Sequence, residues 1–173
     1  MLITVRLAHP GDAPLLPAVE RSAAQAFVDH QGLQAIASSP VLSATQHLRF
    51  ICQHREWVAV DDQDQPLGFL CGQSCGEDWH IVELSVQQSH QGQGLGRRLI
   101  AEAATWAAAQ GYVGLSLTTF ASVPWNAPFY ARLGFKHLAP AQLSEFLQQQ
   151  LAADALHGLS DRCAMRLDLQ GTA

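Results

Sequence analysis

The sequence has few charged residues and more acidic than basic ones. Charged residues make up only 14% of the 173-residue chain, whereas hydrophobic residues make up 48%, so a sizeable core is available and wholesale disorder is excluded. Lys and Arg together number 10 against 15 Asp and Glu, which gives a formal net charge of -5. This balance argues against nucleic acid or an anionic membrane as the main partner. It is permissive for a cationic small substrate.

The sequence also lacks the spacings that bind metals and the segments that direct secretion. Its 4 cysteines form no CxxC pair, and its 8 histidines are scattered without an HExxH motif, so we expect no metal site. No run approaches ~20 apolar residues, and the first residues lack the pattern of a signal peptide. Without a disulfide framework, the thiols fit a reducing compartment. The sequence therefore predicts a cytoplasmic protein in which residues 1–173 form a single domain.

Short apolar runs alternate with longer helical patterns, which predicts mixed α and β structure. Asp12 is expected to cap the first helix, and Asn126 to cap a short helix that ends at Gly134. The predicted strands cover residues 2–7, 57–60, 66–71, 79–86, 112–119 and 163–169. The predicted helices cover residues 12–24, 44–54, 95–110, 127–133 and 143–151.

The strand at 79–86 leads through a glycine-rich turn into a strong helix. Alternation places Glu83 on the same face as Trp79 and Ser85, and a carboxylate in a largely apolar strand is costly unless it has a partner. Gly92, Gly94 and Gly96 can expose backbone N–H groups at the start of the following helix, where the helix dipole adds positive charge. The turn fits neither G-x-G-x-x-G nor the P-loop pattern. It nevertheless predicts a phosphate-binding site.

This part of the chain resembles the GNAT superfamily of N-acetyltransferases. In their acyl-CoA pyrophosphate motif, Arg/Gln-x-x-Gly-x-Gly/Ala, the defining positions match Gln91, Gly94 and Gly96. The run from Asn126 to Phe135 resembles the second signature of the superfamily in loose form. Gln88 departs from the pattern, because many members carry proline there. The order of elements resembles that of the superfamily over nearly the whole chain.

The resemblance implies a fold and an activity. The implied fold is α+β, with a mixed, mostly antiparallel twisted sheet flanked by helices and two central parallel strands that splay apart. The implied reaction is direct transfer of an acetyl group from acetyl-CoA to a primary amine of a small molecule or peptide, in a ternary complex. The implied CoA-binding residues are Leu84, Ser85, Val86, Gln91, Gly92, Gln93, Gly94, Leu95, Gly96, Arg97 and Asn126.

Two residues are candidates for the proton transfers that this reaction needs. Glu83 is the candidate base, acting through a water, although a hydrogen-bonded strand carboxylate explains it equally well. Tyr130 is the candidate acid for the departing CoA thiolate, with a core aromatic as the alternative. The Phe27–Pro40 connection and Trp125 are weaker candidates for lining the acceptor pocket.

A second function stays open beside the enzyme. A non-catalytic acyl-CoA-binding sensor or regulatory module would keep the fold but would need neither Glu83 nor Tyr130. The sequence leaves the acceptor amine, the acyl-chain preference and the oligomeric state undetermined, a homodimer included.

Overall fold

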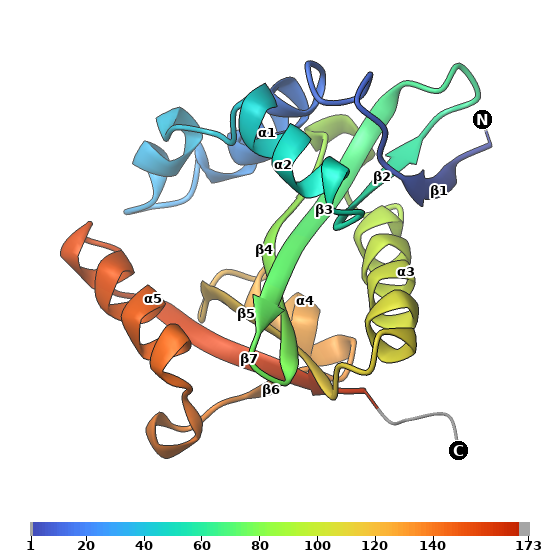
Figure 1. Ribbon diagram of the computed structural model, residues 1–173. Coiled ribbons are helices and arrows are strands. Elements are labelled where there is room, and N and C mark those ends of the chain that lie inside the picture. Colours follow the sequence, from blue (N-terminus) through green and yellow to red (C-terminus); the bar gives the residue numbers. More distant parts are fainter. Residues whose placement is uncertain (1, 170–173) are drawn as a thin grey trace. The chain divides into compact units, whose positions relative to one another are not determined.

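A computed structural model describes residues 2–169 as a seven-stranded sheet with helices (Figure 1). The strands are β1 (Thr4–Leu7), β2 (Glu56–Val60), β3 (Pro66–Cys75), β4 (Asp78–Val86), β5 (Gly114–Phe120), β6 (Lys136–His137) and β7 (Arg162–Asp168). The α-helices are α1 (Leu16–Ala24), α2 (Ala44–Cys52), α3 (Leu95–Ala109), α4 (Ala127–Arg132) and α5 (Glu145–Leu156). Short 3-10 helices are η1 (Gln25–Phe27), η2 (Gln34–Ser38), η3 (Gln88–His90) and η4 (Pro140–Gln142).

The strand order confirms the predicted fold class. The order is β1-β2-β3-β4-β5-β7-β6, with antiparallel pairing of β1 with β2, β2 with β3, β5 with β7, and β6 with β7. Only β4 and β5 pair in parallel, among the strands for which the described residues define a register. Their ladder ends after His80 and Ser116, although both strands continue. The parallel pair therefore sits in the middle of a mostly antiparallel sheet, as expected.

The described residues divide into two compact units. Unit 1 comprises residues 2–73 and 82–105, and unit 2 comprises residues 74–81 and 106–169. Whether residues 1–173 form a single domain stays a prediction. None of the described helices is both long enough and apolar enough to cross a membrane.

Unit 1 has its own apolar core, built where α1 and α2 pack against β2 and β3. Burial of these side chains supplies the main free energy that holds the helices in place. Leu42 and Phe50 pack against the core from its edge. The buried members are Ala8, Ala13, Leu16, Val19, Ile51, Val58, Val60, Phe69 and Cys71.

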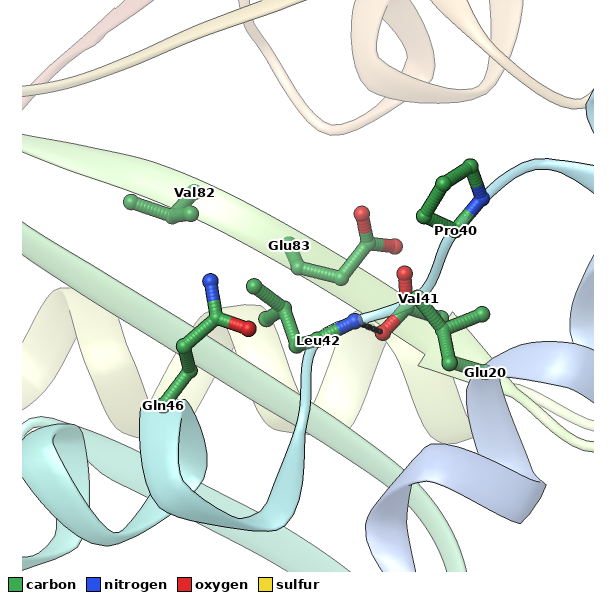
Figure 2. A pocket seen from close by; sticks show the side chains of 7 residues that line it. All are labelled: Glu20, Pro40, Val41, Leu42, Gln46, Val82 and Glu83. Carbon is green, nitrogen blue, oxygen red and sulfur yellow. Dashed lines mark hydrogen bonds between the residues drawn. The ribbon is translucent and has the colours of Figure 1, made fainter.

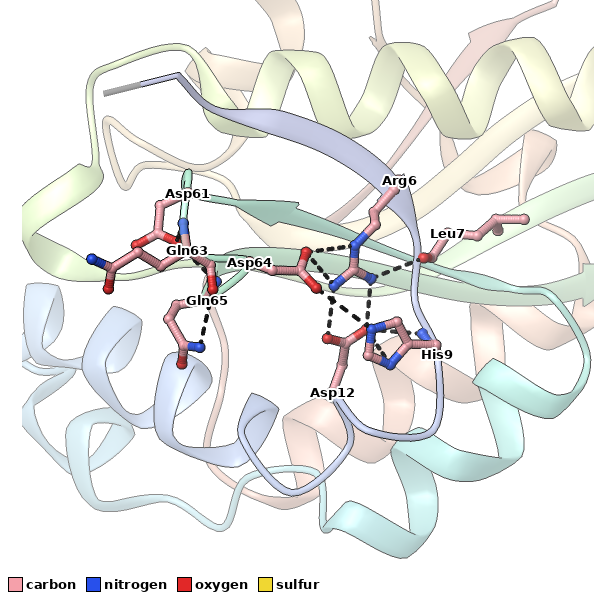
Figure 3. A network of polar contacts seen from close by, with 8 residues as sticks. All are labelled: Arg6, Leu7, His9, Asp12, Asp61, Gln63, Asp64 and Gln65. Atoms are coloured by element: carbon pink, nitrogen blue, oxygen red, sulfur yellow. Dashed lines mark hydrogen bonds and ion pairs between the residues drawn. The ribbon is translucent and has the colours of Figure 1, made fainter.

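In unit 1 the Asp12 carboxylate belongs to a network of polar contacts with Arg6, His9 and Asp64 (Figure 3). Arg6 donates two hydrogen bonds to the Asp12 carboxylate, at 2.8 and 3.0 Å, and two to Asp64. Asp12 also accepts the backbone N–H of His9 at 2.8 Å. The prediction that Asp12 caps a helix is therefore wrong: its carboxylate bonds to Arg6 and His9 instead, and α1 begins at Leu16.

In unit 2, β5 and β7 run side by side through seven residue pairs (Figure 1). An ion pair of Arg166 with Asp78 lies against Gly114, where an added Cβ would come within 2.6 Å of both side chains. Glycine at this position therefore lets the pair cross β5.

The ends of α2 and α4 are formed in different ways, and the expected cap at Asn126 is absent. Ser43 and Gln46 form a capping box at the start of α2. Asn126 precedes α4, but its side chain makes no capping hydrogen bond, because its Oδ1 accepts from Thr119 Oγ1 at 2.7 Å. Gly134 has φ +95°, which agrees with its expected role in ending α4.

Candidate active site

The glycine-rich turn of unit 1 presents backbone N–H groups at the start of α3. Gly92 and Gly94 have φ values of +74° and +83°, in the left-handed region that favours glycine, and nothing lies within 4 Å of where a Cβ would be. Among residues 2–169, no hydrogen-bond acceptor pairs with the N–H groups of Gly92, Gln93 or Gly94. The N–H groups of Leu95 and the next residues of α3 have no intrahelical partner, as at any helix start. The turn can therefore donate several hydrogen bonds to an anion.

Side chains around this turn fix its shape. Gln91 donates from Nε2 to the carbonyl of Val86 at 3.0 Å, and Gln93 donates to the carbonyl of Ser89 at 3.2 Å. Behind the turn, Leu95 is buried, so the helix is anchored while Gly92 and Gly94 stay exposed.

The two arginines that follow the turn have different surroundings. Arg98 donates to the backbone carbonyl of Ile3 at 2.8 Å, which commits its guanidinium to the start of β1. Arg97 is exposed. Of the two, Arg97 is the better placed to add positive charge to an anion site.

The end of β4 approaches β3 closely. An added Cβ on Gly68 would lie 3.0 Å from the carbonyl oxygen of Ser85 and 3.1 Å from the Val86 side chain. Beyond this point the N–H of Gln87 donates to Leu67 at 2.8 Å. The predicted CoA-binding segment, Leu84, Ser85 and Val86, therefore has its backbone course fixed by β3.

Glu83 lies in unit 1 and is hydrogen-bonded within its own strand. Ser85 Oγ donates to Glu83 Oε1 at 2.8 Å, which agrees with the prediction that the two side chains share one face of the strand. Glu83 also lines a cavity of about 300 Å³ in unit 1. The lining residues are Glu20, Pro40, Val41, Leu42, Gln46, Val82 and Glu83 (Figure 2).

The cavity has a second carboxylate, from α1. Figure 2 shows the backbone N–H of Leu42 donating to Glu20, with a distance of 2.9 Å to Oε2. Burial is the main cause that raises the pKa of Glu20 to about 7, and the charge of Glu83 raises it further. The cavity is thus acidic, and a cation would relieve the repulsion between its carboxylates.

Unit 1 also contains a fully buried pair of titratable side chains. His47 on α2 and Glu56 on β2 are both fully buried, with 2.6 Å between Nδ1 and Oε1. Burial raises the pKa of Glu56, and the bond to His47 opposes the rise. Cys71 on β3 is buried too, and burial raises the pKa of its thiol well above the usual range. Of the other free cysteines, Cys52 is exposed.

Tyr130 and Asn126 lie in unit 2. The Tyr130 ring packs edge-on against Phe129 and Phe135, with centroids 5.1 and 5.5 Å apart. Asn126 is held to β5 through Thr119. Glu83 and the glycine turn therefore both belong to unit 1, whereas Tyr130 and Asn126 belong to unit 2.

Sequence reasoning missed Glu20, although one signal for it exists. Glu20 follows the fully buried Leu16 by four residues on α1, so helical periodicity puts it on the face that packs inward. Of the weaker acceptor-pocket candidates, Pro40 does line the cavity, whereas Trp125 lies in unit 2. Within residues 2–169, no cluster of three or more His, Cys, Asp or Glu side chains could hold a metal ion.

Solved structures share this fold at low sequence identity. The PaiA N-acetyltransferase of Thermoplasma acidophilum, in complex with coenzyme A, gives a TM-score of 0.71 at 16% identity, over 97% of this chain and 99% of that one. N-acetylglutamate synthase of Neisseria gonorrhoeae, complexed with coenzyme A and N-acetyl-glutamate, gives 0.73 at 18% identity, over 98% of this chain and 36% of that one. At these identities the likeness shows the fold.

Sequence comparison identifies the family. An 80-residue stretch is 36% identical to peptidyl-lysine N-acetyltransferase YjaB of Salmonella typhimurium and covers 46% of this chain and 49% of that protein. The chain therefore spans about half the length of this curated relative. Residues 25–135 match the model of the acetyltransferase (GNAT) family. This matched range includes the glycine turn, Glu83 and Tyr130. The chain belongs to the acetyltransferase (GNAT) family.

Proposed function

We propose that the protein transfers an acetyl group from acetyl-CoA to a primary amine. The observation that carries this proposal is the glycine turn, whose N–H groups at Gly92, Gln93 and Gly94 are available at the start of α3. Phosphate oxygens are bound by such donors, so this turn is assigned to the CoA pyrophosphate, with Arg97 adding charge. Two solved relatives of the same fold are complexes with coenzyme A.

The remaining assigned residues bind the pantetheine arm or move protons. We assign the backbone of Leu84, Ser85 and Val86 to the amides of the arm, and Asn126 to a contact with it. In the reaction the amine nitrogen attacks the thioester carbonyl, the C–N bond forms and the C–S bond breaks. Glu83 takes, through a water, the proton that the ammonium loses before the attack. Tyr130 gives a proton to the CoA thiolate and regains one from the second N–H bond, which breaks as the amide forms.

The acceptor we propose is the cationic amine of a small molecule or a peptide. The cavity beside Glu83 has carboxylates for an ammonium group and apolar walls from Pro40, Leu42 and Val82 for its methylenes. A peptidyl-lysine acetyltransferase is among the relatives, and a lysine side chain has this chemistry.

Calorimetry with CoA, together with thiol release over a panel of amines, tests the proposal. Binding with turnover on at least one amine supports the enzyme, whereas binding without turnover on any amine favours the sensor module. Gly94→Glu adds bulk and negative charge at the turn and is expected to abolish CoA binding. Gly158→Glu is the matched control, because Gly158 also has a positive φ and open space around it. Retained CoA affinity in Gly94→Glu would contradict the assigned site.

A further inference from the structure

The cavity of unit 1 carries two carboxylates and no basic side chain among its lining residues. Glu20 comes from α1 and Glu83 from β4, so two distant parts of the sequence contribute carboxylates to the same cavity (Figure 2). Only Glu83 has a place in the proposed reaction. The role of Glu20 needs a separate explanation, because a partly buried carboxylate beside another is costly.

Each carboxylate is held by its own hydrogen bond. Leu42 N–H donates to Glu20 at 2.9 Å, and Ser85 Oγ donates to Glu83 at 2.8 Å. Because Leu16 and Val19 anchor α1 in the core, Glu20 cannot swing away from the cavity without breaking its bond to Leu42. The fold therefore keeps the two negative groups near each other.

The groups that act on the Glu20 carboxylate come from β4, β2, β3, α1 and the segment before α2. Glu83 on β4 and Glu56 on β2 disfavour its ionised form, whereas Arg21 on α1 and the Leu42 N–H favour it. On β3, Cys71 interacts electrostatically with Glu20, and its buried thiol is neutral. Glu56 is itself hydrogen-bonded to His47 of α2. Among these neighbours, Glu83 is the largest charge-based contribution to the shift at Glu20.

We propose that Glu20 is a positioning residue for the proton transfer: its carboxylate lines the same cavity as Glu83, and the two act as one proton-accepting pair. This inference rests on the proposed function, in which Glu83 takes the proton of the amine. Burial, and then the charge of Glu83, raise the pKa of Glu20 to about 7, so the last proton leaves the pair near neutral pH.

The pair explains how a glutamate can act as a base at neutral pH. A base works best when its pKa lies near the working pH, and an isolated glutamate titrates near about 4.3. When the doubly ionised pair meets the ammonium of the acceptor, an N–H bond breaks and an O–H bond forms on the pair. The nitrogen keeps the electron pair that attacks the thioester, and the proton later leaves to water.

The pH dependence of kcat/KM in glutamine variants tests this inference. In the wild type we expect the acid limb near pH 7, where the pair gains its proton. Glu20→Gln keeps an acceptor for the Leu42 N–H but removes the charge, so the limb is expected to move down by more than about 1 pH unit. Glu20→Asp keeps the charge and is expected to leave the limb closer to neutral pH. Glu102→Gln, an exposed position on α3, is the control and leaves the limb in place.

The outcomes separate this inference from the proposed function. Full activity of Glu83→Gln overturns the assignment of Glu83 as the base and the inference that rests on it, whereas acetyl transfer itself would stand. Low activity of Glu83→Gln together with an unshifted limb in Glu20→Gln overturns the inference alone. A readout without turnover is the carbon-13 NMR titration of the Glu83 carboxyl in the protein without substrate. Its midpoint is expected to fall in Glu20→Gln, and an unchanged midpoint contradicts the pair.

Discussion

Replacing Glu20 by glutamine is expected to stabilise the folded protein more at pH 8 than at pH 5. Burial, and then the charge of Glu83, raise the pKa of Glu20 from its ordinary value of 4.5 to about 7 in the folded state. A group with a raised folded pKa contributes its full stability below the unfolded pKa and loses it as the pH rises through the folded pKa. The ionised Glu20 therefore destabilises the wild type above about pH 7, and glutamine removes this penalty.

The size of the effect follows from the shift. A rise from 4.5 to about 7 corresponds to about 3 kcal/mol at high pH. Glu20 is only partly buried, and solvent screening reduces this to roughly 2 kcal/mol. At pH 5 the unfolded group is mostly ionised while the folded group is not, so the same treatment leaves well under about 1 kcal/mol. The variant should gain about 1 kcal/mol between the two conditions.

Urea unfolding of the wild type and Glu20→Gln at pH 5, 6, 7 and 8 measures this difference. The pH-independent part of the substitution, including the changed hydrogen bond to Leu42, cancels when the two ends of the series are compared. Glu102→Gln is the control, with the same chemical change at an exposed position and no expected pH trend. A difference between Glu20→Gln and wild type that is the same at every pH would refute the electrostatic reasoning.

Two further predictions concern Tyr130 and the buried pair. Tyr130→Phe is expected to lower kcat by about ten-fold or more, because a proton donor is lost. The CoA affinity measured by calorimetry is expected to stay near the wild-type value. Unchanged turnover would contradict the assignment of Tyr130 as the acid. His47→Ala leaves the fully buried Glu56 without its partner and is expected to cost about 3–5 kcal/mol in urea unfolding. Because burial already raises the pKa of Glu56, that loss should grow as the pH rises, and a loss below about 1 kcal/mol would contradict a partnered buried carboxylate.

The parts of the fold that depend on local sequence could be predicted. Leu95, Leu99 and Ala103 are spaced four residues apart, as on one face of a helix, and all three side chains are buried in the structure. The glycines before them gave the turn, since positive φ at Gly92 and Gly94 is a local property of the backbone. The glycine turn of the candidate site can therefore be predicted from one short segment of the sequence.

The parts that depend on distant partners could not be predicted. Asp12 has the chemistry of a helix cap, but Arg6 and the N–H of His9 bind its carboxylate in the folded chain. Glu20 enters the cavity only because the segment that contains Leu42 folds over α1, 22 residues further along the chain. No pattern within the sequence of either segment shows that they meet.

The unequal exposure of the cysteines offers a way to observe the cavity wall directly. Cys52 is the exposed last residue of α2, the helix whose first turn carries Gln46 into the cavity. Cys71 is buried, so its thiol should resist alkylation under conditions that label Cys52. Cys75 and Cys163 are partly exposed, so the labelling needs a variant that carries Cys75→Ser and Cys163→Ser. In that variant a fluorescent maleimide at Cys52 would report on α2 while amines are titrated, without any change to the carboxylates.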